Sequence, residues 1–175
     1  MSYRPITDVW FLARAKLKGG VKYYGAYLGG FPERARALLG ASIDEPVLHV
    51  CGGMAKLYPY RGGFGPNDKT LDLDPECSPD FHQDARDPYP TGFKAILADP
   101  PYSEIDAAKY RVGEAAYPSP SKIIDRALDA LPSGGRVGLL HYALPKPCGA
   151  RFVAAVGVLC GFQNRIRVYS VFEKP

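Results

Sequence analysis

The sequence predicts an α/β fold, with a mainly parallel sheet that ends in an antiparallel hairpin and carries helices on both faces. After residue 40, short apolar runs alternate with a helical pattern, which is typical of parallel sheets built from βαβ units. Near the carboxyl terminus, two longer apolar runs follow one another with only a short polar turn between them, which indicates a hairpin. The length of 175 residues suits one domain, and we expect residues 1–175 to form it.

The strands of this sheet are predicted from short apolar runs. Each run ends at a glycine, an aspartate or a turn, and the run KTLDLD alternates leucine with aspartate, so one of its faces is buried. The turn of the hairpin is the segment FQN. The expected strands are residues 46–50, 69–74, 93–99, 135–142, 151–161 and 165–174.

The clearest helix is predicted over residues 119–131. Ser119 is a suitable N-cap, Pro120 occupies the first helical position, and the apolar residues that follow fall on one face. Residues 7–18 and 32–40 are also predicted to be helical, so that residues 1–40 form a helical amino-terminal segment. Residues 103–118 have no persistent period, and we expect a mobile loop there.

Composition limits the classes of protein that this chain can belong to. Its apolar share of 46% and charged share of 23% are those of a globular protein. It has no apolar run of the roughly 18 residues that span a bilayer, no signal-peptide pattern and no CxxC pair that would indicate a zinc site. We therefore expect a cytoplasmic protein without a membrane segment or a bound metal ion.

Positive charge is concentrated near the amino terminus. Residues 1–36 hold seven lysines and arginines but only two acidic residues, whereas the whole chain has a net charge of +4. Such an excess indicates a polyanionic partner, although a solvated helical face would have the same composition.

Glycines and acids follow three of the expected strands at the point where each strand ends. Gly52 and Gly53 come after the first strand, where missing side chains would let a ligand approach the backbone. Asp72 and Asp74 end the second strand about 20 residues later, which suits the binding of a ribose diol. The third, residues 99–102, reads DPPY. Ligands of open α/β sheets bind beyond the carboxyl ends of the strands, so these groups predict a binding site.

The DPPY motif resembles that of the class I S-adenosylmethionine-dependent methyltransferases. More narrowly, it is similar to the amino-methyltransferases of adenine N6 or cytosine N4 in DNA, whose signature is Asp, Asn or Ser, then Pro-Pro and an aromatic residue. The segments TLDLDPECSP, FHQDAR and KYYGAYLGGFPERARALL resemble further segments of that family. The resemblance extends over most of residues 20–173. It implies a Rossmann-like sheet of seven strands and S-adenosylmethionine as the cofactor.

The resemblance also implies a role for individual residues. Asp72 would bind the cofactor ribose beside Asp74, and Asp84 would meet the amino group of its adenine. The implied cofactor-binding residues are Tyr27, His49, Cys51, Gly52, Gly53, Asp72, Asp74 and Asp84. The implied catalytic residues are Asp99, Pro100, Pro101 and Tyr102, and no metal ion is implied.

The chemistry expected of DPPY is the activation of a weak nucleophile. The lone pair of an exocyclic amine is delocalised into its aromatic ring. Hydrogen bonds to the Asp99 carboxylate and the Pro100 carbonyl would draw the nitrogen toward tetrahedral geometry. Tyr102 would stack on the base, which must leave a duplex to reach a buried methyl donor. Rigid prolines suit a site whose main contribution is positioning.

The leading interpretation is a methyltransferase of nucleic-acid bases, with adenine N6 in DNA ranked first and cytosine N4 in DNA or an RNA base ranked after it. A protein glutamine N5 methyltransferase and a non-catalytic binding module of this fold are the alternatives. Two positions depart from the family pattern, since His49 stands in place of an acid and Ala55 in place of a glycine. We expect no separate target-recognition domain, so sequence specificity would be weak, be supplied by loops or come from a partner subunit. The basic segment and residues 103–118 would border the cleft.

Overall fold

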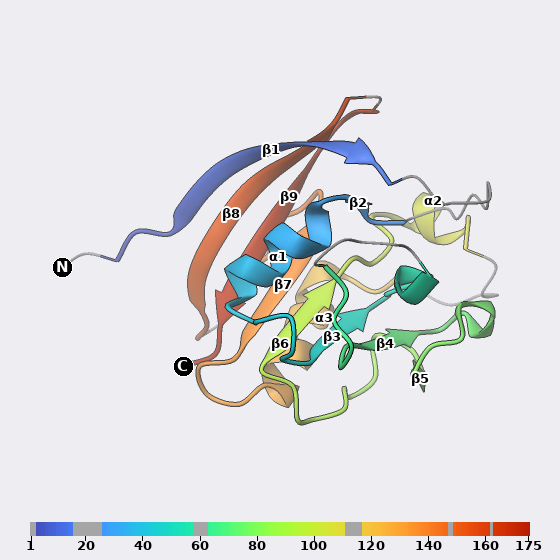
Figure 1. Cartoon of the computed structure of the whole chain (residues 1–175), viewed down its shortest axis with the longest axis horizontal. Coiled ribbons are helices and arrows are strands. Elements are labelled where there is room, and N and C mark those ends of the chain that lie inside the picture. The colour runs from blue at the N-terminus through green and yellow to red at the C-terminus, as the bar shows by residue number, and fades with distance from the viewer. Residues whose placement is uncertain (1–2, 16–25, 58–62, 111–116, 147–148, 162) are drawn as a thin grey trace.

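Figure 1 shows the computed structural model of the chain. The structure describes residues 3–15, 26–57, 63–110, 117–146, 149–161 and 163–175, without the side chains of residues 163 and 164. In chain order, the strands and α-helices are β1 (Ile6–Arg14), β2 (Leu28–Gly29), α1 (Phe31–Leu39), β3 (Val47–Val50), β4 (Lys69–Asp72), β5 (Phe81–His82), β6 (Ala95–Ala98), α2 (Glu104–Ala107), α3 (Pro120–Ala130), β7 (Arg136–His141), β8 (Arg151–Cys160) and β9 (Gln163–Glu173). Two short 3₁₀ helices, Ala55–Leu57 and Pro75–Cys77, precede and follow β4 in the sequence.

The described strands form one nine-stranded sheet in the order β2-β1-β8-β9-β7-β6-β3-β4-β5. The strands β5, β4, β3, β6 and β7 are parallel neighbours, whereas β9 runs antiparallel to both β7 and β8. The α/β fold with a carboxyl-terminal antiparallel hairpin is therefore confirmed. The seven strands that the resemblance implies correspond to those from β5 to β8 in the sheet order, and β1 and β2 extend the sheet beyond them (Figure 1). β5 is the one of these seven for which no strand was expected at its residues.

The helix predicted over residues 7–18 is wrong in its described part. Ile6–Arg14 is instead strand β1, which runs parallel to β8. Trp10 and Leu12 are buried, while Val9 and Phe11 between and beside them are exposed, which is the period of a strand. The four consecutive apolar residues 9–12 fit the period of a helix and that of a strand equally well. The segment forms a strand because β8 offers an edge with which it pairs. Among the described residues of the amino-terminal segment, only α1 is helical.

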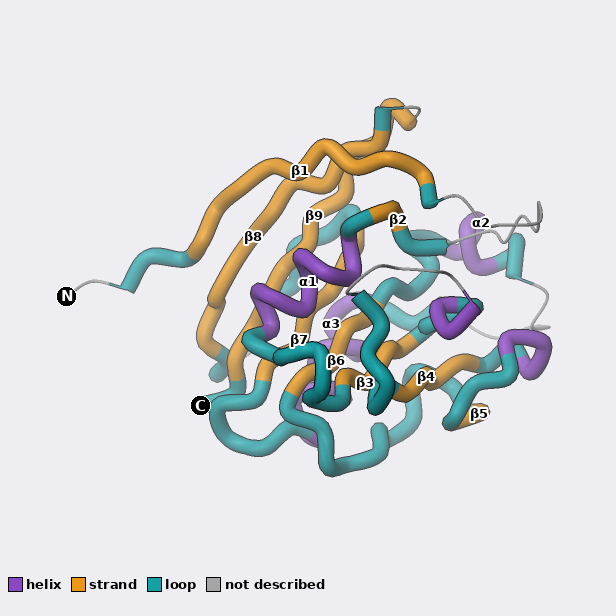
Figure 2. The backbone as a smooth tube through the Cα atoms, viewed as in Figure 1, coloured by secondary structure: helices purple, strands orange, loops and turns teal. Residues whose placement is uncertain are grey.

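Helices cover both faces of the sheet, as predicted. α1 lies in front of the sheet and α3 behind it (Figure 1, Figure 2). α3 begins at Pro120 after the Ser119 cap, whose hydroxyl accepts the Lys122 N–H at 3.3 Å, and it buries Ile123, Ile124 and Ala127. α1 ends at Leu39, and the capping residue Gly40 has a φ of 73°, which is easily reached only by glycine. None of the described helices is long and apolar enough to cross a membrane.

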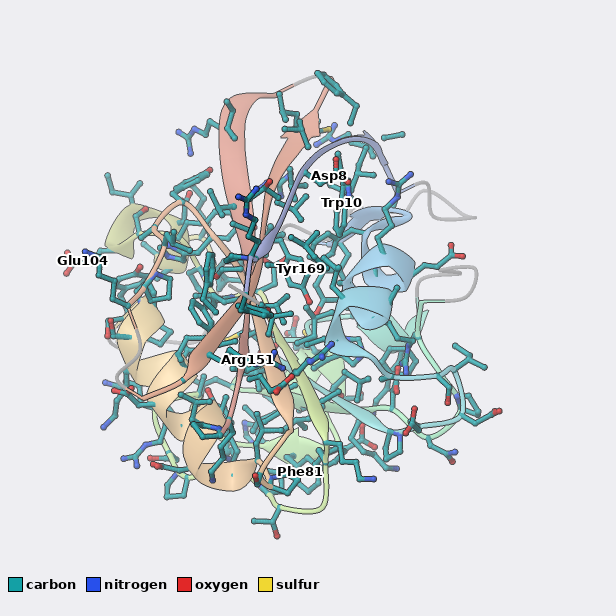
Figure 3. The ribbon with its side chains drawn as sticks, turned by 90° about the vertical axis from the view of Figure 1, so that its left-hand side faces the viewer. Asp8, Trp10, Phe81, Glu104, Arg151 and Tyr169 are labelled. Atoms are coloured by element: carbon teal, nitrogen blue, oxygen red, sulfur yellow. The ribbon has the colours of Figure 1, made fainter. Side chains whose placement is uncertain are left out.

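The space between α1 and the sheet is filled by aromatic rings. Trp10 and Tyr169 lie there side by side (Figure 3), with ring centroids 6.1 Å apart, and both rings also contact Phe31 of α1. Tyr169 fits because β7 has a glycine beneath it: a Cβ at Gly138 would lie 2.1 Å from the Tyr169 hydroxyl. This packing fixes β9 and α1 relative to one another, and it thereby sets the position of the residues at the carboxyl edge of the sheet.

Residues 103–118 contain a short helix within the irregular segment expected from the sequence. α2 spans Glu104–Ala107, and the Ser103 hydroxyl caps it by accepting the Asp106 N–H at 3.1 Å. Residues 111–116 of this segment lie outside the described residues, as do the basic residues Lys16, Lys18 and Lys22. Their expected place beside a substrate cleft stays a prediction.

Candidate functional site

The sequence-predicted site residues come from neighbouring strands at one edge of the sheet. Because β3, β4 and β6 are parallel, their carboxyl ends meet at this edge. The glycine turn follows β3, Asp72 ends β4, and Asp99 follows β6. Asp99 also continues the alternation by which Ala95 and Leu97 face α1. The fold thus brings the predicted ribose acid, glycine turn and catalytic acid to a common edge.

Asp72 holds the turn that follows β3. Its Oδ2 accepts the Gly53 N–H at 2.8 Å, and its Oδ1 accepts the Asp74 N–H at 3.0 Å. Burial raises the pKa of this carboxyl group, although these N–H donors oppose the rise. Each oxygen of a carboxylate can accept a further hydrogen bond, so Asp72 retains acceptor capacity for the hydroxyls of a ribose.

The turn itself leaves no room for larger residues. A Cβ at Gly52 would lie 2.9 Å from the His49 carbonyl oxygen and 3.1 Å from Cγ2 of Thr70. Cys51 and Gly53 have positive φ values of 53° and 49°, and this conformation is uncommon for a residue with a side chain. Burial raises the pKa of the Cys51 thiol, and the carboxylates at this edge raise it further. Cys51 is therefore a neutral thiol among acids.

Asp74 and Asp84 are each engaged with nearby groups of the protein. Asp74 Oδ1 accepts the Glu76 N–H at 2.9 Å and caps the 3₁₀ helix that follows β4. Asp84 pairs with Arg86 through both oxygens, with Oδ1–Nε at 2.9 Å and Oδ2–Nη2 at 2.6 Å. The hydrogen bonds from Arg86 hold the pKa of Asp84 below its ordinary value. Their expected cofactor contacts stay predictions.

Tyr27 and His49 lie inside the protein, where they belong to a buried polar network. His49 Nδ1 lies 3.3 Å from the Tyr27 hydroxyl, and its Nε2 lies 3.2 Å from Oδ2 of Asp68. Asp68 forms an ion pair with Arg36 and accepts the Val47 N–H at 2.9 Å. Burial lowers the pKa of His49, although the Asp68 carboxylate opposes this. His49 stands where the family that the sequence resembles has an acid. It contacts the carboxylate of Asp68, which comes from another part of the chain.

The DPPY turn carries a half-buried carboxylate. The backbone N–H of Asp99 donates to the Val50 carbonyl at 3.2 Å, which joins the turn to β3. The Tyr102 hydroxyl donates to Asp99 Oδ1 at 2.6 Å. Burial raises the pKa of Asp99 to about 6, although this hydrogen bond and the charge of Arg167 oppose the rise. Burial also raises the pKa of Tyr102 far above its usual range, so its hydroxyl remains a donor.

Aromatic rings that sequence reasoning did not assign to the site surround Tyr102. The ring of His141 meets Tyr102 edge-on at 5.5 Å, and that of Tyr142 lies 4.6 Å away. His141 Nδ1 accepts the Ala143 N–H at 2.9 Å, which places the proton of the neutral ring on Nε2. Nε2 lies 2.8 Å from the Tyr117 hydroxyl, which in turn donates to the Tyr102 carbonyl at 3.4 Å. These hydrogen bonds connect the DPPY turn, through the Tyr102 carbonyl, to the segment that follows β7.

Two arginines of β9 border the same rings. Arg167 Nη1 donates to the Tyr102 hydroxyl at 3.4 Å, and the guanidinium of Arg165 lies 5.8 Å from the ring centroid of Tyr142. These residues lie far from DPPY in the sequence, and the antiparallel pairing of β9 with β7 brings them there. Within the described ranges, no three histidines, cysteines or acids are arranged to hold a metal ion.

Comparison with known proteins adds to this geometry. No protein-family model and no curated protein matches the sequence. The chain is similar to the solved structure of TrmN from Thermus thermophilus, with 23% identity and a TM-score of 0.59 over 87% of this chain and 50% of that one. The N-methyltransferase NodS from Bradyrhizobium japonicum, in complex with S-adenosyl-L-homocysteine, matches with 14% identity and a TM-score of 0.51 over 82% of this chain and 86% of that one.

A putative class I S-adenosylmethionine-dependent methyltransferase from Listeria monocytogenes matches with 13% identity and a TM-score of 0.50 over 79% of this chain and 56% of that one. The chain has the class I methyltransferase fold. Similarity at these identities establishes the fold alone. The chain spans about half the length of the TrmN structure that it matches.

Proposed function

We propose that this protein transfers a methyl group from S-adenosylmethionine to an exocyclic amine of a nucleic-acid base. The observation that carries the proposal is the half-buried carboxylate of Asp99, which lies at the carboxyl edge of the sheet and bonds to Tyr102 at 2.6 Å. The fold and the DPPY motif support the same assignment. A strongly perturbed carboxylate beside a glycine turn is a typical feature of a catalytic site rather than of a structural turn.

The residues on the β3–β4 side fit the cofactor. Asp72 can accept hydrogen bonds from a ribose diol, and its bond to the Gly53 N–H holds the glycine turn beside it. A Cβ at Gly52 would meet the His49 carbonyl oxygen and Thr70, so the turn can pack this closely only with glycine there. Asp84 is the residue to which the resemblance gives the adenine amino group, and its pairing with Arg86 fixes its orientation. S-adenosylmethionine, when bound, supplies an electrophilic methyl group.

The residues around Asp99 would prepare the amine. Tyr102 occupies Oδ1 of Asp99, so the amine would bind Oδ2 and the Pro100 carbonyl. Hydrogen bonds to these two acceptors would localise the nitrogen lone pair and direct it at the methyl group. Methylation leaves a positive charge on the nitrogen, and the Asp99 carboxylate would accept the surplus proton. Most of the acceleration would come from holding the two reactants in line.

A nucleic-acid substrate is supported by the aromatic rings and arginines beside Asp99. Tyr102 and Tyr142 form a tilted pair, and Arg165 lies against Tyr142. Aromatic rings bordered by cations are typical of sites that bind unpaired bases. The sequence ranks adenine N6 in DNA first, followed by cytosine N4 and RNA. Protein glutamine, whose side chain has no ring to stack, suits these rings less well.

We expect Asp72→Ala to weaken the binding of S-adenosylmethionine about 10- to 100-fold. The substitution removes a half-buried carboxylate, and charge-assisted hydrogen bonds of this kind contribute about 1.5–3 kcal/mol. Isothermal titration calorimetry on the full chain measures the effect. Asp129→Ala is the matched control, because that side chain lies on α3 and is 74% exposed. An affinity of Asp72→Ala within twofold of wild type would remove Asp72 from the cofactor site.

The same titration separates this proposal from a non-catalytic module. A module that only keeps the fold would not bind S-adenosylmethionine, whereas the proposed enzyme would bind it in the absence of nucleic acid. Specificity for a sequence would then come from loops or from a partner subunit, which co-purification with the full chain would reveal.

A further inference from the structure

Arg167 is a buried cation, and two of its nitrogens have no hydrogen-bond acceptor among the described residues. Its exposed fraction is 8%, and neither Nε nor Nη2 has a hydrogen-bond partner among the residues that the structure describes. Nη1 is engaged with the Tyr102 hydroxyl. Nε–H and Nη2 lie on the same side of a guanidinium group, where they form a fork that binds two adjacent acceptors. Burying such a fork without a partner is costly, which indicates that a ligand completes it.

The fork lies on the target side of Asp99. Arg167 continues the alternation by which Tyr169 and Val171 face α1, the same face as Asp99. It is two strands from β6 in the direction away from β3 and β4, a separation of about 10 Å at the usual strand spacing. The proposed cofactor residues lie on the opposite side of Asp99. A base whose amine binds Asp99 would therefore extend toward Arg167.

We propose that Arg167 binds the target base itself and selects bases that carry two adjacent acceptors. This inference rests on the proposed function. Guanine offers O6 and N7 as such a pair, and cytosine offers N3 and O2. Adenine offers no such pair, because the lone pairs of N1 and N3 diverge on either side of the C2 hydrogen, and the group beside N7 is the amine, which is a donor. The fork therefore favours guanine or cytosine over adenine N6, the substrate that the sequence ranks first.

Burial argues for a base rather than a phosphate group at this fork. The sugar-phosphate backbone of a flipped nucleotide stays at the rim of a pocket while the base enters it. Arg165 is exposed and suits a phosphate, whereas Arg167 is buried and donates to the Tyr102 hydroxyl. A base edge is thus the part of the substrate that can reach Nε and Nη2.

The test uses single-stranded oligonucleotides of thymine, or of uracil in RNA, that each contain one guanine, cytosine or adenine. Wild-type protein should transfer labelled methyl groups to the guanine or the cytosine oligonucleotide with a kcat/KM about 10- to 100-fold above that for adenine. Arg167→Lys keeps the charge but removes the fork. It should bring the three values within about threefold of each other, mainly through a higher KM for the preferred base. Arg151→Lys, a like change on β8, is the control.

Binding of the same oligonucleotides in the presence of S-adenosylhomocysteine, measured by fluorescence anisotropy, tests the inference apart from catalysis. Tighter binding of the guanine or cytosine oligonucleotide by wild type, lost in Arg167→Lys, supports it even if no methyl group is transferred. Equal affinities of wild type for all three bases overturn it, and so does a preference for adenine. If Arg167→Lys weakens all oligonucleotides equally, including one without an amine, Arg167 binds phosphate and the inference is wrong. Each of these results leaves the proposed methyltransferase activity to be decided by the transfer assay.

Discussion

Asp99→Ala is expected to reduce the rate of methyl transfer about 100- to 10,000-fold, the range typical of a lost acid–base group. Its carboxylate orients the amine and accepts the proton, and both roles belong to the chemical step. The affinity for S-adenosylmethionine should change by no more than about threefold, because loss of a transition-state interaction leaves ground-state binding intact. The paired measurement is turnover at saturating cofactor and affinity by calorimetry.

Asp99→Asn is the matched variant, since it keeps one acceptor oxygen and removes the charge. It should retain more activity than Asp99→Ala. If Asp99→Ala transferred methyl groups at the wild-type rate, DPPY would be only a turn between β6 and α2.

The pH dependence of turnover should report the same carboxyl group. Its pKa is raised by burial to about 6, and only the ionised form accepts hydrogen bonds from the amine. Turnover should therefore fall as the pH drops below about 6, and Asp99→Asn should lack this step. The pKa of Asp99 in the folded state lies above its unfolded value of about 3.9. Between pH 6 and pH 4 the folded protein therefore binds a proton at Asp99 more readily than the unfolded chain does, and this proton binding stabilises the folded state. A loss of activity in this window is thus not caused by unfolding through Asp99.

Asp68→Ala is expected to lower the free energy of unfolding by about 3–5 kcal/mol, the cost of removing one partner of a buried ion pair. Arg36 and Asp68 are both buried, and Asp68 also accepts the N–H groups of Gly65 and Val47. Loss of the carboxylate would leave the cation and these donors without their acceptor. Thermal unfolding should show a decrease of about 6–20 °C in Tm. Asp44→Ala, at an exposed position nearby, should change Tm by less than about 2 °C.

The same pair gives a pH dependence of stability. Burial alone would raise the pKa of Asp68, but hydrogen bonds from His49 and Arg36 outweigh it and hold the pKa below its ordinary value. A lowered folded-state pKa means that the stabilisation is present above the unfolded pKa of about 3.9 and is lost as the pH falls through the folded-state value. If Asp68→Ala unfolded at the wild-type temperature, the network around His49 would not hold β3 to α1.

Local pattern was sufficient to predict most of the fold. Residues 119–131 carry a cap, a proline and a periodic apolar face, and the structure has α3 there from Pro120 to Ala130. The helix predicted over residues 7–18 is wrong because the segment VWFL fits a helix and a strand equally well. Only its pairing with the distant strand β8 distinguishes the two. A sequence read in short windows contains no information about such pairings.

The site residues that directly follow predicted strands could be predicted from the sequence. Those that reach the site only through the pairing of distant strands could not. Asp72 and Asp99 end predicted strands, so the rule for open sheets places them at one edge. Arg167 and His141 reach that edge through the antiparallel pairing of β9 with β7. Asp68 lies 3.2 Å from His49, although the sequence offers no pattern that links the two. A basic residue on the last strand of such a sheet, two residues before a core aromatic, is the signal that would have found Arg167.

Identification of the methylated product tests the proposed function most directly. The full chain is incubated with labelled S-adenosylmethionine and single-stranded DNA, duplex DNA, RNA or protein, and the digests are analysed by mass spectrometry. We expect a nucleoside that carries the label on its exocyclic amine, and we expect this product to be lost with Asp99→Ala. Label on a ring carbon, a ribose oxygen or a glutamine side chain would contradict the account, as would cofactor binding without transfer to any of these substrates.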